Sequence, residues 1–167
     1  MTAMRTGLVL ATIVLLGASA CRETTEAANA GSALEQFFGR GTLTLTADDG
    51  SKHQFDIYLA TNYEQQRRGL MFVRSMPATT GMLFVYDEPG IRSMWMKNTY
   101  IPLDMVYARA DGSVSSVIHD TQPLSLTSQR SVEPVVYVLE LNAGTARRLQ
   151  IGKRSRFTWQ SNDAGKK

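Results

Sequence analysis

The chain has 167 residues, of which 43% are hydrophobic and 20% are charged. This composition is that of an ordinary globular protein, and it excludes disordered, collagen-like and disulfide-dense classes. The net charge of +3 is too small to indicate a nucleic-acid partner. One Cys excludes an internal disulfide, and two His residues exclude a three-histidine zinc site. We expect one domain with no bound metal or cofactor.

Residues 1–20 have the layout of a secretory signal. Arg5 precedes an apolar stretch at 8–16, and small residues at 18–20 form an Ala-Ser-Ala cleavage site. The apolar stretch is too short for a bilayer core, which needs about 20 residues. Cys21 follows the cleavage site directly, which is the position of the acylated Cys in bacterial lipoproteins. We predict an exported protein, periplasmic or tethered to the membrane by a lipid on Cys21, with plain secretion and an uncleaved anchor as the alternatives.

The segment after Cys21 is polar and small, so residues 21–40 are expected to be a flexible tether. Its last part contains three apolar residues that are expected to pack on the domain as a short turn: Leu34, Phe37 and Phe38. The folded domain is predicted to span residues 41–160. Residues 161–167 are expected to fray.

Alternating residues, apolar runs and Asp-Gly turns predict eight strands in chain order. They cover residues 42–46, 55–59, 81–86, 91–97, 101–108, 113–119, 135–141 and 156–160. A helix is expected from Thr61 to Arg68, with Thr61 and Glu64 as a capping box and Gly69 as its end. A second short helix is expected at 142–149 with Asn142 as its cap.

Short strands with hairpin turns and few helices predict a mainly β (β-rich α+β) domain. We expect a single compact antiparallel β-sandwich or barrel-like domain with one or two short helices. A doubly wound fold is excluded because no helix of sufficient length lies between the strands.

Four ordered blocks carry a family resemblance. They are RRGLM at 67–71, GMLFVY at 81–86, WMKNT with IPLD at 95–104, and YVLELNAG at 137–144. Together they resemble the family called domain of unknown function 192, over about residues 41–160. One difference is Met94, where the family usually has an aromatic residue. The resemblance implies a compact, mainly β domain that is often exported, and it implies no activity.

Polar residues and an aromatic residue are concentrated between Trp95 and Asp104, which favours a small ligand pocket. The alternative is structural: a turn at 98–100, with Asp104 paired to Lys97 or capping the backbone. Arg67 and Arg68 are interpreted as charges that complement the end of a helix dipole. The predicted ligand-binding residues are Arg74, Trp95, Lys97, Asn98, Thr99, Asp104 and Glu140.

The sequence contains no nucleophile elbow and no zinc-protease motif. We therefore expect a non-enzymatic envelope module that binds a small polar ligand or a protein partner. The alternatives are a hydrolase that uses Asp104 and Glu140, a Cu(I) carrier that uses Met94 and Met96 on one strand face, and a purely structural envelope protein. Core packing is the competing interpretation of the methionines.

Overall fold

The computed structural model describes residues 34–162. The predicted signal, Cys21 and the first part of the predicted tether lie outside this range. Residues 34–37 are helical, and both Leu34 and Phe38 are buried. At the other end Asn162 donates its N–H to the Arg40 carbonyl.

The described part is mostly β-structure, as predicted. Its strands are β1 (Gly39–Thr46), β2 (Lys52–Ala60), β3 (Thr80–Gly90), β4 (Ser93–Met94), β5 (Leu103–Ala108), β6 (Val114–Ile118), β7 (Gln129–Arg130), β8 (Val135–Asn142) and β9 (Arg156–Ser161). Its labelled helices are α2 (Tyr63–Arg68) and α3 (Thr145–Arg148). The strand predicted at 91–97 is only the two-residue β4, which pairs with β7 in a separate small sheet.

Seven strands form the main sheet in the order β6-β5-β8-β3-β2-β1-β9. All neighbours are antiparallel except β2 and β3, which run parallel. The β2–β3 pair therefore departs from the antiparallel arrangement that the sequence predicts. The connection through α2 and residues 69–79 is long enough for the crossover that a parallel pair requires.

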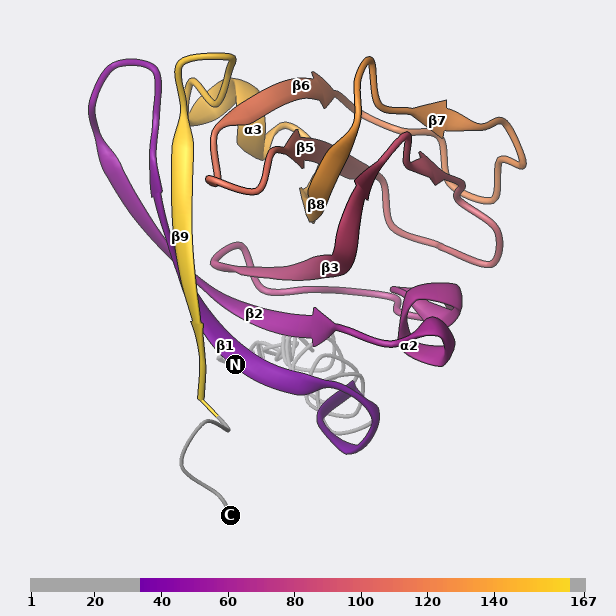
Figure 1. The fold of residues 1–167 in the computed structure, drawn as a ribbon. Coiled ribbons are helices and arrows are strands. Elements are labelled where there is room, and N and C mark those ends of the chain that lie inside the picture. Colours follow the sequence, from indigo (N-terminus) through magenta and orange to yellow (C-terminus); the bar gives the residue numbers. More distant parts are fainter. Residues whose placement is uncertain (1–33, 163–167) are drawn as a thin grey trace, which may run out of the picture.

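The sheet curls into a half-barrel so that its two edge strands approach each other (Figure 1). Ser113 forms an isolated antiparallel bridge with Arg156 at the start of β9. The Phe157 N–H donates to the Gly112 carbonyl at 3.0 Å, and the Val114 N–H donates to the Ser155 carbonyl at 2.9 Å. The barrel-like alternative is therefore the correct one. The two edge strands, β6 and β9, are joined where each of them begins.

Each face of the sheet has its own hydrophobic core, because side chains alternate between faces along a strand. The concave core contains Leu43, Ile57, Leu139 and Phe157. The second core lies on the opposite face and includes Phe84. It is covered by residues from the connections: Leu70, Val73, Met76, Met96 and Ile101. The candidate site forms at the edge of this second core.

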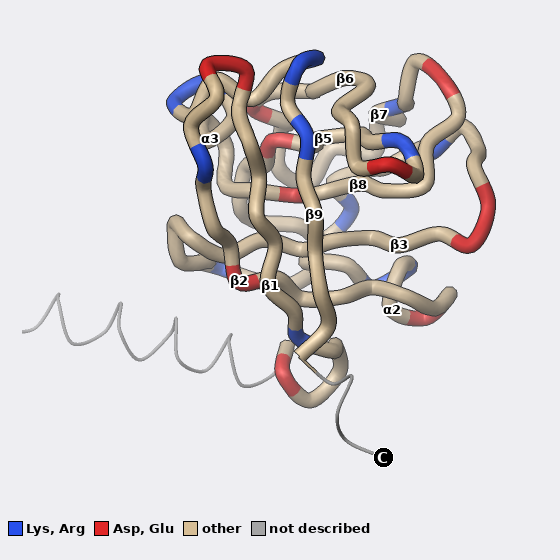
Figure 2. The backbone as a smooth tube through the Cα atoms, turned by 60° about the vertical axis from the view of Figure 1, so that its left-hand side comes forward, with Lys and Arg blue, Asp and Glu red and all other residues tan. Residues whose placement is uncertain are grey.

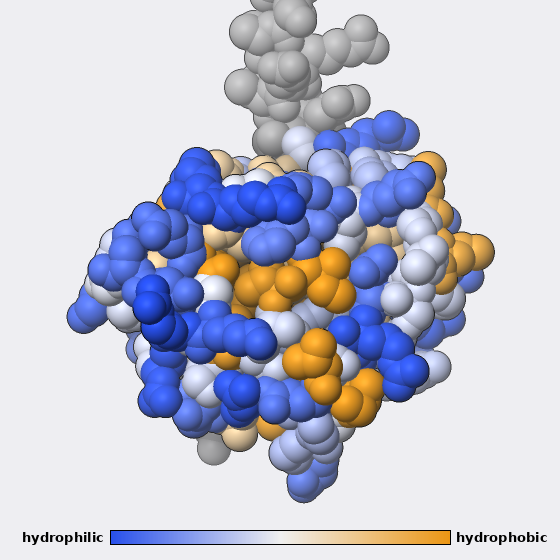
Figure 3. Space-filling view, turned by 90° about the horizontal axis from the view of Figure 1, so that it is seen from above, coloured by the Kyte–Doolittle hydropathy of each residue, from blue (hydrophilic) through white to orange (hydrophobic). Residues whose placement is uncertain are grey.

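The surface carries charges of both signs. They lie mainly in the turns and at the ends of the strands (Figure 2). Seen from above, most of the surface is hydrophilic, with hydrophobic residues gathered near its middle (Figure 3). Within residues 34–162, none of the helices combines the length and the hydrophobicity needed to cross a bilayer.

Candidate functional site

Helix α2 forms one wall of the site, and its ends are fixed by local chemistry. Asn62 is the N-cap, and its Oδ1 accepts the Gln65 N–H at 3.0 Å. The predicted cap is thus displaced by one residue, and Gln65 takes the expected role of Glu64 by accepting the Thr61 N–H. Gly69 ends the helix with φ 46, as predicted, and donates its N–H to the Gln65 carbonyl.

The helix is held against the rest of the domain by two amide side chains. Gln66 donates to the Val85 carbonyl on β3 at 2.8 Å, and Gln65 donates to the Phe37 carbonyl at 2.9 Å. These bonds fix the last turn of α2, which carries Arg67 and Arg68. Arg68 is half-buried there, whereas Arg67 is exposed.

Glu140 lies on β8 and faces the second core. It pairs with Met82 on β3 and Met105 on β5, two residues that are themselves fully buried. Glu140 is only 4% exposed, and no hydrogen bond or ion pair reaches its carboxyl group within the described residues. This burial raises the pKa of Glu140 from 4.5 to about 8. The carboxyl group is therefore mostly protonated at neutral pH.

A cavity of about 90 Å³ reaches the Glu140 side chain from the surface. It has an apolar wall with polar and charged residues around it: Gln66, Arg67, Arg68, Gly69, Leu70, Met71, Phe84, Tyr86, Ser93, Met94, Trp95, Lys97, Thr99 and Glu140. One water molecule needs roughly 10–15 Å³ on this measure. The cavity therefore has room for a small polar group.

A wider groove of about 480 Å³ adjoins this cavity. Its lining residues are Phe37, Glu64, Arg67, Arg68, Met71, Phe72, Trp95, Lys97 and Asn98. Five of these also line the cavity: Arg67, Arg68, Met71, Trp95 and Lys97. We call the two together the Glu140 groove. Its outer part falls within the roughly 300–1,000 Å³ typical of small-molecule sites.

Cations and exposed aromatic rings alternate around the mouth of the Glu140 groove. The Lys97 Nζ lies 5.2 Å from the ring centroid of Trp95, which is 47% exposed. The Arg68 guanidinium lies 5.7 Å from both the Phe37 and the Phe72 ring centroids. Arg68 Nε is buried and has no hydrogen-bond partner within residues 34–162. One lining of the groove thus contains both an unpartnered acidic group and an unpartnered cationic N–H.

Two residues at the outer rim have left-handed backbone conformations. Phe72 has φ 69 and Asn98 has φ 54, and the Phe72 N–H donates to the Asn98 carbonyl at 2.8 Å. Asn tolerates this region, whereas a bulky residue such as Phe rarely adopts it. The strained backbone leaves the Phe72 ring 54% exposed at the groove. Such strain clusters at ligand sites in proteins.

Five of the seven predicted site residues come together. Trp95, Lys97, Thr99 and Glu140 line the inner cavity, and Asn98 lines the outer groove. The Thr99 hydroxyl also donates to the Lys97 carbonyl at 3.2 Å, so it shapes the loop. The other two predicted residues, Arg74 and Asp104, line neither the cavity nor the outer groove.

Arg74 stacks over Tyr100, with its guanidinium carbon 5.1 Å from the ring centroid. Tyr100 in turn makes an edge contact with Phe72 at 6.3 Å between centroids. Arg74 therefore reaches the groove only through two aromatic rings.

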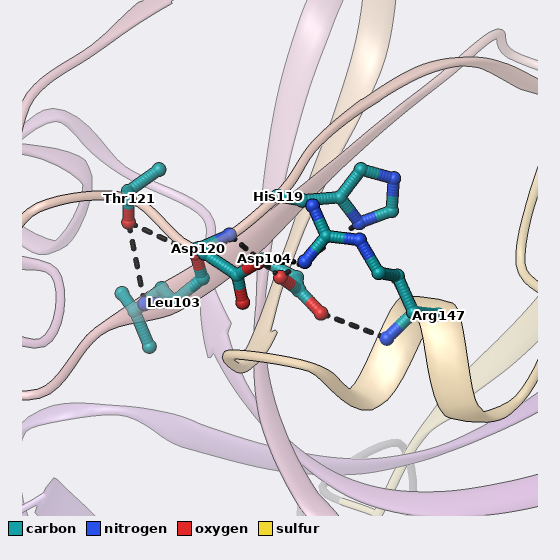
Figure 4. A network of polar contacts seen from close by, with 7 residues as sticks. Leu103, Asp104, His119, Asp120, Thr121 and Arg147 are labelled. Atoms are coloured by element: carbon teal, nitrogen blue, oxygen red, sulfur yellow. Dashed lines mark hydrogen bonds and ion pairs between the residues drawn. The ribbon is translucent and has the colours of Figure 1, made fainter.

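Asp104 is fully buried on the opposite face of the sheet from Glu140, because it pairs with Leu141 on β8. Its carboxylate accepts the Ala146 N–H at 2.7 Å and the Asp120 N–H at 3.0 Å (Figure 4). His119 Nδ1 lies 3.9 Å away. Asp104 thus lines neither part of the groove, and its contacts are those of the structural alternative: its carboxylate caps α3.

The prediction that Asn142 caps α3 is wrong. The N-cap is Gly144, which has no side chain, and Asn142 instead donates to the Met76 carbonyl at 2.8 Å. This bond anchors the connection before β3. The carboxylate that accepts an N–H at the start of α3 belongs to Asp104. Because Asp104 is distant in sequence, a local sequence motif cannot predict this contact.

Five methionines pack in the second core: Met76, Met82, Met94, Met96 and Met105. Met94 is 9% exposed and Met96 is fully buried, whereas Trp95 between them is exposed, as their alternation predicts. The Met96 sulfur lies 3.2 Å from the Thr121 hydroxyl. Within residues 34–162, no group of three or more His, Cys, Asp or Glu side chains could hold a metal ion. The structure favours core packing over copper binding.

Two tyrosines face Glu140 from the neighbouring strands. Burial is the main cause that raises the pKa of Tyr86 to about 12, and proximity to Glu140 contributes. Burial and Glu140 likewise raise the pKa of Tyr107. The Tyr86 hydroxyl lies 3.8 Å from the Met94 sulfur and the Tyr107 hydroxyl donates to the Gln129 carbonyl at 2.9 Å. Both phenols are therefore occupied elsewhere and leave Glu140 unpartnered.

The contribution of α2 to the site does not follow from the sequence pattern. That pattern indicates Arg67 and Arg68 only as helix-end charges, although they line both parts of the Glu140 groove. The available signal was their place in the RRGLM block that carries the family resemblance. Phe72 follows this block immediately and had no signal of its own, because an exposed Phe in a loop has no periodic pattern.

Comparison with known proteins places this geometry in a family. The model of domain of unknown function 192, described as an uncharacterized family, matches residues 44–159. The chain belongs to this family. The match includes α2, β3 and β8, so all the elements that form the inner cavity lie within the family domain. No curated protein matches the chain.

Two solved structures are similar to the described fold. A protein from Sinorhizobium meliloti 1021, described as a candidate transcription regulator, is 38% identical with a TM-score of 0.71, over 73% of this chain and 95% of that one. A protein of unknown function from Novosphingobium aromaticivorans DSM 12444 is 33% identical with a TM-score of 0.68, over 71% of this chain and 84% of that one. Both likenesses support the fold, and neither establishes an activity for this domain.

Proposed function

We propose that this protein is a non-enzymatic binding module of the cell envelope whose Glu140 groove takes a small polar ligand. The observation that carries the proposal is the Glu140 carboxyl group, which is buried in a cavity and lacks a partner within the described residues. A buried polar group without a hydrogen bond costs about 1–3 kcal/mol. A ligand that supplies the missing partner recovers this cost on binding.

The surroundings of Glu140 favour a ligand-binding role over a buried group without a function. The cavity continues into a larger groove that is open at the surface and lined by exposed rings of Phe72 and Trp95. Aromatic surface with a few convergent polar groups is typical of small-molecule sites. The cations at the rim give the entrance a positive potential, because Glu64 is the single acidic residue of the described range that lines the outer groove.

A binding role fits the geometry better than the paired-carboxylate hydrolase. Acid–base catalysis by two carboxyl groups requires both to face one substrate. Asp104 and Glu140 lie on opposite faces of the sheet, and Asp104 already caps α3. Among residues 34–162, no second carboxyl group lines the inner cavity around Glu140.

The envelope location is also part of the proposal. The signal-like residues 1–20 and the Cys at the cleavage site support export with a lipid on Cys21, which would attach the protein to a membrane. Mass spectrometry of the native N-terminus tests this: a diacylglyceryl or triacylated Cys21 is expected. An unmodified Cys21 would contradict the lipoprotein proposal and leave the groove proposal unaffected.

The groove proposal is tested by ligand screening with the purified protein. Intrinsic Trp fluorescence and thermal unfolding are followed with a panel of sugars, amino acids, nucleotides and short peptides. At least one class should shift both signals in the wild type and lose most of its effect in Glu140→Gln. The control Glu88→Gln changes an exposed carboxylate near the end of β3 and should bind normally. A ligand that binds Glu140→Gln and the wild type equally would contradict the proposal.

A further inference from the structure

We infer that the Glu140 groove recognises a small zwitterion that carries a primary ammonium group and a carboxylate, with the ammonium at Glu140 and the carboxylate at Arg68. This inference rests on the proposed function and names its ligand class. An amino acid and a short peptide share this chemistry, and calorimetry with both kinds of probe distinguishes them.

The inner end of the groove selects a hydrogen-bond donor. Within the described part of the chain, Glu140 is the one acidic residue that lines the cavity of about 90 Å³, and the three cations in the same lining form no ion pair with it. The neighbouring phenols of Tyr86 and Tyr107 contact other acceptors or sulfur atoms. A compact ammonium group donates up to three hydrogen bonds and gains the most from an unpaired carboxylate in a low-dielectric site.

Apolar side chains contribute to the lining of the cavity that holds Glu140. Leu70 and Phe84 are buried in the second core and also line the cavity, and Met94 is 9% exposed. A ligand that reaches Glu140 therefore contacts these apolar side chains. They give a short aliphatic linker behind the ammonium group an apolar surface to pack against.

The outer end selects an anion. Arg68 Nε is buried without a partner within residues 34–162, while its guanidinium is held near the Phe37 and Phe72 rings. Lys97 lines the same outer groove, and Arg67 is the cation already paired, with Glu64 at 3.4 Å. A carboxylate on the ligand would satisfy the Arg68 N–H, since arginine binds carboxylates in fixed geometry.

Binding is expected to displace a proton. The free Glu140 carboxyl is protonated at neutral pH because burial raises its pKa to about 8. An ammonium beside it favours the carboxylate, so the proton passes to the buffer while the ligand keeps its own. The other charged or titratable groups that face the cavity are Arg67, Arg68, Lys97 and Tyr86, with Tyr107 on the next strand. Burial raises the pKa of both tyrosines, so their phenols keep their protons at pH 7, and the Glu140→Gln variant shows whether the released proton comes from Glu140.

Calorimetric titration of the purified protein tests the inference at pH 7 in two buffers of different ionisation enthalpy. The probes are glycine, β-alanine, 4-aminobutyrate and diglycine, which vary the spacing between ammonium and carboxylate and separate amino acids from peptides. At least one probe should bind with release of close to one proton. Its N-acetyl and methyl ester derivatives, which each lack one charge, should bind at least about tenfold more weakly, or 1.4 kcal/mol.

Three variants assign the two ends. Glu140→Gln should lower the affinity for the best probe at least about tenfold and abolish proton release. Arg68→Gln should lower the affinity for that probe but leave the affinity for its methyl ester unchanged, because the ester lacks the charge that Arg68 binds. Arg148→Gln is the matched control, since it removes an exposed cation of α3 away from the groove.

The outcomes separate this inference from the proposed function. Binding without proton release, or equal affinities for a probe and its two derivatives, would contradict the inference that the ligand is a zwitterion. If none of the probes binds but another member of the screening panel binds in a Glu140-dependent way, the inference fails and the proposed function stands. If no ligand of any class binds, both fail.

Discussion

A single buried carboxyl group sets the chemistry of this domain at the scale of residues. Glu140 and Asp104 are both almost completely buried, yet their environments differ. Asp104 accepts two backbone N–H groups and acts as a structural cap. Glu140 has no such partner within residues 34–162. The free-energy cost of burying its carboxyl group is therefore not compensated until a ligand binds.

The pH dependence of stability tests the state of Glu140. Its folded pKa of about 8 lies above the ordinary value of 4.5, so the folded protein binds more protons than the unfolded chain between these values. The free energy of unfolding of the wild type should therefore fall as pH rises from about 4.5 to 8, relative to Glu140→Gln, by up to about 1.4 kcal/mol per pH unit. Below this window the difference is constant.

Urea denaturation of both proteins across this pH range measures the difference directly. Because all other groups are shared, their contributions cancel when the variant is subtracted from the wild type. Two stability curves that run parallel from pH 4.5 to 8 would mean that Glu140 is ionised in the folded state, which contradicts a protonated carboxyl group.

At the scale of elements, the strands were predictable and their partners were not. Periodic sequences at 42–46 and 135–141 predict strands close to β1 and β8, because alternation follows from the geometry of a single strand. The parallel pairing of β2 with β3 depends on a crossover, which leaves no periodic trace. The block at 95–104 is contiguous in sequence, but β5 sends Asp104 to the other face and leaves only its first part at the groove.

Helix α2 offers a test of local structure against the sequence motif. Asn62→Ala removes the side chain that accepts the Gln65 N–H, and it should lower the free energy of unfolding by about 1 kcal/mol. Thr61→Ala removes only an exposed hydroxyl bond to Gln65 at 3.2 Å, so it should cost less. Chemical denaturation compares the two. A larger loss in Thr61→Ala would restore the capping box that the sequence suggested.

At the scale of the whole molecule, the half-barrel depends on the contact between its two edges. Gly112 lies in the turn before β6 with φ 80, and its carbonyl accepts the Phe157 N–H from β9. A Cβ at this position would lie 2.0 Å from the Phe157 carbonyl oxygen. The same backbone conformation occurs at Gly50, φ 86, where a Cβ would meet nothing within 4 Å.

This pair separates backbone strain from loss of closure. Gly112→Ala and Gly50→Ala should share the cost of a positive φ, but Gly112→Ala should be less stable by about a further 1–3 kcal/mol because the edges must move apart. Thermal and urea unfolding measure both variants. Equal losses would mean that the edge contact contributes nothing to the stability of the fold.

A crystal structure of the protein grown with the tightest ligand from the screen would show whether the Glu140 groove is the binding site. We predict ligand density in this groove, with a donor atom within hydrogen-bond distance of the Glu140 carboxyl group. Density at another surface, with the Glu140 carboxyl group still unpartnered, would contradict the assignment of the binding site to this groove.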